Sequence, residues 1–305
     1  MSQTPWQHRS QWAGPFAAIG ALVLWSIGPI LIEYLTHYLD SWTQNALRYS
    51  IAALFWLPLL MFSIQRGRFG RHVWRKAALP SLANVFMQSC WAAMFYFLNP
   101  AFAVLLTKTN VLWIAGFSLL LLPEERILFT RRRFWLGLVL ALTGVFGVLY
   151  TGPEFSVVGS MTGVMLALSA AACWGVYAVL VRICFVNVNS QSGFSVVSLY
   201  TAAGLWLAAV CFGHISQCLS LSLNLWLILT ISGIISIAIA HVLFYAAVRR
   251  MGATLPGLVI LVQPFLVLLM SHLVFGESMS LIQLLFGVVL TSGAACAIWA
   301  QKHLA

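Results

Sequence analysis

The chain has 305 residues, of which 62% are hydrophobic and only 7% are charged, and its formal net charge is +10. A soluble domain carries about 25% charged residues, so this composition excludes a water-facing surface and indicates an integral membrane protein. The basic residues stand between apolar segments, without the interleaved aromatic residues or the soluble fold of nucleic-acid modules, and we expect no nucleic-acid partner.

The first half of the chain contains five apolar stretches long enough to cross about 30 Å of hydrocarbon, which takes about 20 helical residues. They lie at Gly14–Tyr34, Thr43–Ser63, Arg75–Phe95, Asn99–Leu121 and Phe134–Thr151. The second half contains five more, at Ser160–Val181, Phe194–Gly213, Leu225–Arg249, Thr254–Phe275 and Leu281–Ala300. The connections are too short to fold as soluble domains. The sequence therefore predicts an all-α integral membrane protein with ten transmembrane helices.

Residues of the first half recur about 150 positions later in the chain. Trp25 recurs as Trp174, and Gly144 recurs as Gly293. Because each copy holds an odd number of spans, the second copy enters the bilayer upside down relative to the first. We predict two inverted-topology five-helix repeats, residues 1–152 and 153–305, which is an architecture of secondary transporters.

Basic residues set the expected orientation, because loops rich in Lys and Arg stay on the cytoplasmic side. With both termini in the cytoplasm, 14 of the 16 Lys and Arg residues fall on that side, and the other two, Arg48 and Lys108, fall within spans. We expect a multi-pass protein of the cell (inner) membrane with cytoplasmic amino and carboxyl termini.

Lys108 is the strongest candidate for a site residue. It lies nine residues into the fourth span, which is about 14 Å deep and close to the midplane. A lysine there costs about 2.5–3.5 kcal/mol on insertion scales, so it should face a partner or a watery cavity. The alternative is a later helix start that lets Lys108 snorkel to the interface. The polar run from Thr107 to Asn110 favours a cavity wall and a local break in the helix.

Three further amide side chains lie within spans. Asn84 and Gln88 are four residues apart on one face of the third span, with Trp91 about one turn further. These residues either bind a polar small molecule or link helices, since amide hydrogen bonds between membrane helices are common. Gln263 lies in the middle of the ninth span and precedes Pro264, which frees a backbone carbonyl. That position favours a binding site.

Other residues keep two interpretations open. His241 and Tyr245, one turn apart in the eighth span, fit either proton transfer or packing. Trp25 and Trp174 either pack at the pseudo-twofold axis or line a cavity. Arg48, near the outer end of the second span, is more readily explained as a salt bridge to Glu33 or an interfacial anchor than as a substrate ligand.

The distribution of charge and the lack of enzyme motifs narrow the expected function. No carboxylate lies in mid-span, which disfavours a proton-coupled antiporter built on an embedded glutamate, whereas an embedded cation favours an anionic substrate. The chain has no zinc-protease, serine-hydrolase, Walker or dinucleotide motif. We expect a small-molecule substrate and the lipid bilayer as partners, no cofactor and no metal site. Protons or counter-ions as partners and the oligomeric state are left open.

The repeated tryptophan in the first span of each copy, and the acidic ends of spans four and nine at Glu125 and Glu277, are similar to the drug/metabolite transporter superfamily in its ten-helix EamA-type branch. The resemblance covers nearly the whole chain. It implies a central cavity lined by helices one to four and six to nine, with helices five and ten at the periphery. One departure is the absence of a mid-helix proline after Asn110, where the second copy retains Gln263-Pro264.

The resemblance and the residues together predict a secondary transporter that moves a small polar metabolite by alternating access. An amino acid or another carboxylate-bearing compound is the favoured substrate. An exporter of drugs or organic cations is the alternative, and an intramembrane enzyme is less expected because no nucleophile–base pair is visible.

Overall fold

The structure, a computed structural model, describes residues 13–66, 70–98, 100–151, 161–275 and 280–302. The helices of the first half are α2 (Ala13–Thr36), α3 (Ser41–Gln65), α4 (His72–Met94), α5 (Pro100–Leu106), η1 (Thr107–Thr109), α6 (Asn110–Leu121), η2 (Pro123–Glu125), α7 (Arg126–Phe129) and α8 (Arg132–Tyr150). Those of the second half are α9 (Met161–Phe185), α10 (Ser190–Phe212), η4 (Ile215–Ser220), α11 (Leu223–Ile231), η5 (Ser232–Ile239), α12 (Ala240–Met251), α13 (Thr254–Val259), η6 (Ile260–Val262), α14 (Gln263–Phe275) and α15 (Leu281–Lys302).

Five helical stretches of the described residues are long and apolar enough to cross a membrane. They are Ala13–Thr36, Ser41–Gln65, Met161–Phe185, Ser190–Phe212 and the continuous stretch Leu223–Met251. The all-helical architecture agrees with the sequence-based expectation. The remaining predicted spans also coincide with helices, but the count of ten membrane crossings stays a prediction. The expected acidic end of the ninth span, at Glu277, lies outside the described residues.

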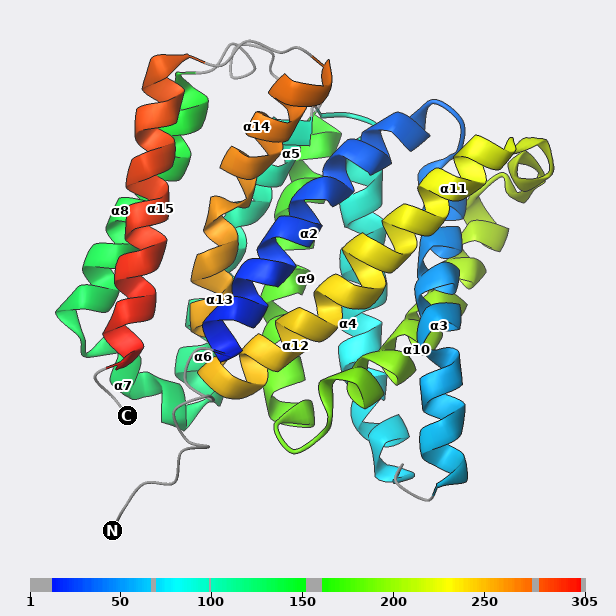
Figure 1. Cartoon of the computed structure of the whole chain (residues 1–305), viewed down its shortest axis with the longest axis horizontal. Coiled ribbons are helices and arrows are strands. Elements are labelled where there is room, and N and C mark those ends of the chain that lie inside the picture. The colour runs from blue at the N-terminus through cyan, green and yellow to red at the C-terminus, as the bar shows by residue number, and fades with distance from the viewer. Residues whose placement is uncertain (1–12, 67–69, 99, 152–160, 276–279, 303–305) are drawn as a thin grey trace.

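Contacts between helix ends show that the first helices of the two halves run in opposite directions. Tyr96, which follows α4, donates a hydrogen bond to the carbonyl of Leu39, which follows α2. Gly163, near the start of α9, packs against Phe97, which also follows α4. The end of α2 therefore lies at the same side of the bundle as the start of α9. These first helices of the two halves are antiparallel, and both described chain ends lie at the opposite side (Figure 1).

α8 and α15 form a closely packed pair at one edge of the bundle (Figure 1). A Cβ atom added to Gly144 would lie 2.5 Å from the backbone nitrogen of Leu290, and one added to Gly293 would collide with the backbone of Ala141. Only glycine permits this approach of two helix backbones. The recurrence of Gly144 as Gly293 thus has a packing cause.

Hydrogen bonds connect the two halves at both sides of the bundle. At the side of the chain ends, the Glu125 carboxylate accepts from the backbone N–H groups of Ala253 and Thr254 at 2.6 and 3.1 Å and from the Thr254 hydroxyl at 2.6 Å. At the other side, Asp40 accepts from the N–H of His214 at 2.9 Å. A carboxylate from the first half therefore holds backbone of the second half at each side.

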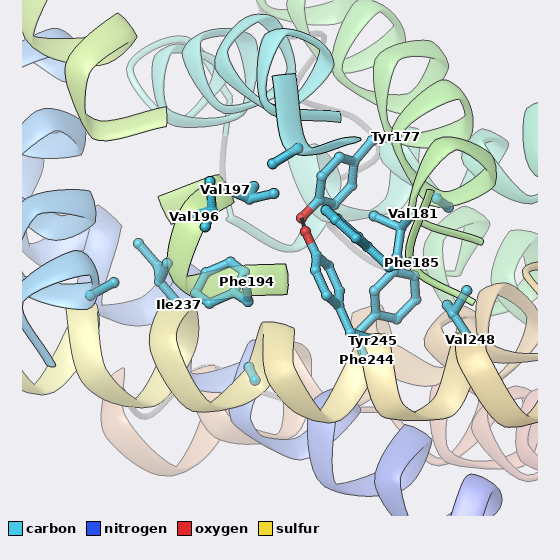
Figure 2. Close-up of a cluster of buried hydrophobic side chains, with 14 of the residues drawn as sticks. Tyr177, Val181, Phe185, Phe194, Val196, Val197, Ile237, Phe244, Tyr245 and Val248 are labelled. Carbon is cyan, nitrogen blue, oxygen red and sulfur yellow. Dashed lines mark hydrogen bonds between the residues drawn. The ribbon is translucent and has the colours of Figure 1, made fainter. Parts of the chain in front are cut away.

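A buried aromatic cluster packs α9, α10 and α12 together. The hydroxyl groups of Tyr177 and Tyr245 lie 2.6 Å apart in a hydrogen bond, with Phe185 and Phe194 against the Tyr245 ring (Figure 2). Tyr177 and Tyr245 lie one turn beyond Trp174 and His241, toward the side that holds the chain ends. The cluster therefore packs these three helices together toward that side of the bundle.

Candidate functional site

A cavity in the middle of the bundle collects polar side chains from both halves. Its empty volume, which includes open solvent, is about 590 Å³, so the cavity is far too small for a folded domain. Its described lining comes from α2, α3, α4, η1, α6, α9, η5, α12, η6 and α14, and α10 contributes no residue to that lining. The polar members are Arg48, Gln88, Thr107, Lys108, Asn110, Ser236, His241 and Gln263.

Lys108 is held in the wall by a chain of hydrogen bonds that crosses between the halves. The Lys108 Nζ donates to Gln263 Oε1 at 2.7 Å, and Gln263 Nε2 donates to the carbonyl oxygen of Trp25 at 2.9 Å. The Trp25 carbonyl is available because Pro29, four residues later in α2, has no N–H to donate to it. Lys108 is 3% exposed and lines the cavity. Its ammonium therefore lies inside the bundle, and snorkelling to an interface is ruled out.

Two short 3-10 segments place these residues. η1 interrupts the fourth helical stretch at Thr107–Thr109, and η6 interrupts the ninth at Ile260–Val262. Asn110 and Gln263, the first residues after the two segments, both line the cavity. The hydroxyls of Thr107 and Thr109 donate hydrogen bonds to backbone carbonyls of the preceding turn, those of Val104 and Leu106. The expected break at the polar run is therefore present, with a counterpart in the other half.

Arg48 also lines the cavity, which differs from the expected ion pair with Glu33. Its Nε donates to the hydroxyl of Ser232 in η5 at 2.8 Å. The residue is 2% exposed, and its Nη1 is buried without a hydrogen-bond partner among the described residues. Arg48 lies seven residues into α3, and packing of η5 against α3 covers it, so it never reaches the interface.

Several buried polar atoms of the lining lack hydrogen-bond partners in the described part of the chain. They are Arg48 Nη1, Asn110 Oδ1, Trp174 Nε1, Ser236 Oγ and His241 Nε2. Buried polar groups in proteins are nearly always satisfied, and each exception calls for an explanation such as a ligand. Because five such atoms line one cavity, it is a candidate binding site for a polar molecule.

Aromatic rings form the side of the cavity nearest the Tyr177–Tyr245 cluster. The rings of Trp25 and Trp174 meet edge to face with centroids 5.0 Å apart, and the His241 ring lies 5.1 Å from that of Trp25. Phe194 stacks on the other face of His241 at 4.9 Å. Because these rings pack against one another, they form a rigid apolar wall beside the polar groups.

A sequence model of the EamA-like transporter family matches residues 12–150 and 161–299, once in each half of the chain. The chain belongs to the EamA-like transporter family. Members of this family are transporters of the drug/metabolite transporter type, so the protein is a membrane transporter and its two matched halves are the two EamA repeats.

Other comparisons concern the fold alone. One crystal structure of another protein superposes on this EamA chain with a TM-score of 0.73, covering 95% of this chain and 98% of the other at 23% sequence identity. A search of curated proteins finds no match. The similarity therefore supports the architecture and leaves the substrate to be inferred from the cavity.

The EamA cavity brings together most of the residues that the sequence singled out. The sequence-predicted residues in its lining are Lys108, Asn110, Gln88, Trp91, Gln263, His241, Trp25 and Trp174. Their role in binding stays a prediction.

Two predicted site residues, Asn84 and Tyr245, lie outside the lining. The Asn84 amide donates to Thr201 at 3.0 Å and to Tyr49 at 3.1 Å, which joins α3, α4 and α10. The Tyr245 hydroxyl forms a hydrogen bond with the hydroxyl of Tyr177. Both side chains have partners within the bundle, so packing is their evident role.

Among the polar lining residues, Ser236 escaped the sequence-based selection altogether, and Arg48 was considered there but not selected as a site residue. The sequence did indicate a role for Arg48, because an arginine within a span is costly and needs a partner. A salt bridge to Glu33 was the simpler explanation from the sequence. Ser236 is four residues after Ser232 in an apolar span, a spacing that puts both on one helix face. In the structure both serines lie in the π-helical segment η5, where Ser232 accepts from Arg48 and Ser236 lines the cavity.

Proposed function

We propose that this EamA protein is a secondary transporter of a small polar metabolite that carries a carboxylate or another anionic group. One observation carries this proposal: Lys108 is a buried cation in a cavity whose described lining contains no carboxylate. Gln263 satisfies one ammonium donor and supplies no countercharge. An unpaired charge in a low-dielectric site is strongly unfavourable, and an anionic substrate relieves that cost.

Alternating access is the proposed mechanism. The antiparallel first helices and the two family matches support repeats 1–152 and 153–305 that rock around the cavity. The Tyr177–Tyr245 cluster lies toward the side of the chain ends and is the proposed barrier on that side. Its opening is expected to break the Glu125 contacts with α13. Since the chain has no Walker motif, transport runs on a substrate or ion gradient, and no enzymatic step is involved.

Orientation in the membrane follows from where the basic residues gather. Among the described ones, those of the α3–α4 connection, α7 and the start of α8 share one side of the bundle with the ends of α9 and α12, and this is also the side of the chain ends (Figure 1). We place this side in the cytoplasm, with ten crossings of the cell (inner) membrane. The aromatic cluster is then the cytoplasmic barrier.

Export of drugs or organic cations is the second candidate. The tryptophan wall favours it, because aromatic faces attract cations. The buried charges of Lys108 and Arg48 oppose it, because like charges in a dry cavity repel. We therefore place the anionic substrate first.

The test is Lys108→Ala, measured as thermal stabilisation of the purified full-length protein by a panel of small mono- and dicarboxylates. Binding raises the melting temperature by mass action. Loss of a hydrogen bond to a charged group, about 1.5–3 kcal/mol, should weaken binding about ten- to hundredfold. Lys108→Arg should restore it only in part, because a planar fork does not reproduce the geometry of an ammonium.

Lys76→Ala is the matched control, since it removes an exposed lysine at the start of α4, outside the cavity. It should leave binding unchanged. If Lys108→Ala binds every carboxylate as well as the wild type does, the lysine has no part in recognition and the anionic substrate is excluded.

A further inference from the structure

Arg48 is a second buried cation in the wall of the cavity. A guanidinium carries five N–H donors, and among the described residues its side chain has one hydrogen bond, from Nε to the hydroxyl of Ser232. Its Nη1 is buried and unpartnered in the described part of the chain. Serine is uncharged, so Ser232 orients the guanidinium and leaves its charge uncompensated.

The segment that holds Arg48 is specialised for this contact. η5 is a π-helix, a form found frequently at functional sites. It packs closely on α3, because a Cβ atom added to Gly233 would lie 2.8 Å from the carbonyl oxygen of Arg48. Ser236, further along η5, lines the cavity with an unpartnered hydroxyl among the described groups. η5 and α3 thus place a guanidinium and a hydroxyl in one region of the cavity wall.

Arg48 and Lys108 belong to different parts of the wall. Arg48 is fixed by Ser232 between α3 and η5, whereas Lys108 is fixed by Gln263 between η1 and α14. The described lining supplies two cations and no carboxylate. A molecule with one anionic group in contact with Lys108 leaves Arg48 without a countercharge.

We propose that the cavity selects small molecules with two anionic groups, one bound by Lys108 and the other by Arg48. This inference rests on the proposed function and adds a second point of recognition to it. A guanidinium binds carboxylate or phosphate through two parallel hydrogen bonds, which gives geometric selectivity as well as charge. The wall formed by Trp25 and Trp174 suits a short apolar or planar link between the two groups.

The experiment compares carboxylates in matched pairs that differ by one charge. The probes are butyrate with succinate, valerate with glutarate, and benzoate with terephthalate, each titrated against the purified full-length protein at neutral pH. For at least one pair, the dicarboxylate should bind about tenfold or more tightly than its partner, as expected for an added charge-assisted hydrogen bond.

Arg48→Gln then assigns the second group. It should reduce the affinity for the preferred dicarboxylate about ten- to hundredfold, down to that of the matched monocarboxylate. Binding of the monocarboxylate should fall by clearly less than that of the dicarboxylate, and retained monocarboxylate binding also shows that the variant is folded. If Arg48→Gln does not fold, Arg48→Lys replaces it, with a smaller loss confined to the dicarboxylate. Arg250→Gln removes an exposed arginine at the end of α12 and is the matched control.

The outcomes separate this inference from the proposed function. Equal affinities within every pair, or an equal loss of both members on Arg48→Gln, would overturn the two-anion site while a Lys108-dependent anion site stands. Equal loss would mean that one carboxylate contacts both cations. If no probe binds and Lys108→Ala has no effect, both proposals fall together.

Discussion

A lysine in the middle of a membrane span costs about 2.5–3.5 kcal/mol on insertion scales, and Lys108 is buried with one amide oxygen as its hydrogen-bond partner. Asn84 illustrates the opposite case, because Thr201 and Tyr49 accept its amide protons. The bundle thus provides acceptors for both amide protons of Asn84 and, among the described residues, one acceptor for the Lys108 ammonium.

Asp40 provides a pH-dependent test at the scale of one residue. It caps α3 by accepting from the N–H groups of Trp42 and Thr43, both at 3.0 Å. Burial alone would raise the pKa of this carboxyl, but the hydrogen bonds donated by Thr43, His214 and Trp42 outweigh burial and lower the pKa below its ordinary value. A folded-state pKa below the unfolded value adds stability above the unfolded pKa, near 4, and this stability is lost as pH falls through the folded pKa.

Asp40→Ala should therefore cost about 0.5–2 kcal/mol between pH 5 and 8, as for other lost helix caps, and the cost should shrink below about pH 4. Asn189→Ala is the matched control, because Asn189 caps α10 at the equivalent place in the second repeat and cannot titrate. Melting temperatures across this pH range provide the measurement. A difference for Asp40→Ala that does not vary with pH would contradict the assigned role of the carboxylate.

The sequence predicted the location of a single residue only where its depth within a membrane span was sufficient evidence. Lys108 was identifiable because its distance from both ends of an apolar span is fixed by helix geometry. Asn84 and Gln88 share a helix face, so periodicity could not separate them, yet Asn84 faces Thr201 and Gln88 lines the cavity. Which neighbouring helix covers a polar side chain depends on how the helices cross, and the local sequence pattern does not determine that crossing.

At the scale of elements, the cavity is built where helices are interrupted. η1 and η6 replace one α-helical turn in each repeat, and η5 is π-helical over eight residues. Such departures turn side chains away from the positions that a regular helix would give them. The three segments supply Thr107, Lys108, Ser236, Ile237 and Ile260 to the lining.

These interruptions were unequally predictable. The polar run after Leu106 indicated η1, and Pro264 indicated a disturbance near η6 because proline cannot donate to a preceding carbonyl. The segment Ser232–Ile239 is apolar and contains no proline, so nothing local indicated η5. Its π-helical form accompanies close packing against α3, where Gly233 approaches the Arg48 carbonyl.

The α8–α15 pair gives a stability prediction at the scale of elements. Gly144→Ala should destabilise the protein by about 1–3 kcal/mol, because the new methyl group would force the two backbones apart. Gly116→Ala in α6 is the matched control, since no heavy atom of the described residues lies within 4 Å of its added Cβ atom. That change should be neutral or slightly stabilising, as expected from helix propensity.

Thermal unfolding in detergent measures both glycine variants. Because neither α8 nor α15 contributes to the described lining, carboxylate affinity of folded Gly144→Ala should stay within about twofold of the wild type, well inside the tenfold that a lost charged hydrogen bond produces. Equal melting temperatures for the two variants would show that the α8–α15 contact is not as close as the structure has it.

For the whole molecule, the two repeats meet at three levels. The Glu125 contacts with Ala253 and Thr254 lie at the side of the chain ends, the contact of Lys108 with Gln263 lies in the cavity, and the contact of Asp40 with His214 lies at the far side. Exposure of the cavity to alternate sides requires the outer contacts to break in turn while the middle one changes little. The odd number of spans predicted for each copy sufficed to predict the opposite directions of α2 and α9, whereas the cavity draws on helices far apart in sequence and needed the fold.

Uptake into proteoliposomes addresses transport itself most directly. Liposomes containing the purified protein, preloaded with the unlabelled dicarboxylate that binds best, should take up the labelled compound faster than unloaded ones. Uptake should saturate with concentration and should fall about ten- to hundredfold in Lys108→Ala at subsaturating substrate. Such exchange follows from a site that faces one side at a time. Two results would contradict a transporter of anionic metabolites. One is flux that rises linearly with concentration and does not depend on the preloaded compound. The other is uptake no greater than in protein-free liposomes for every carboxylate tested.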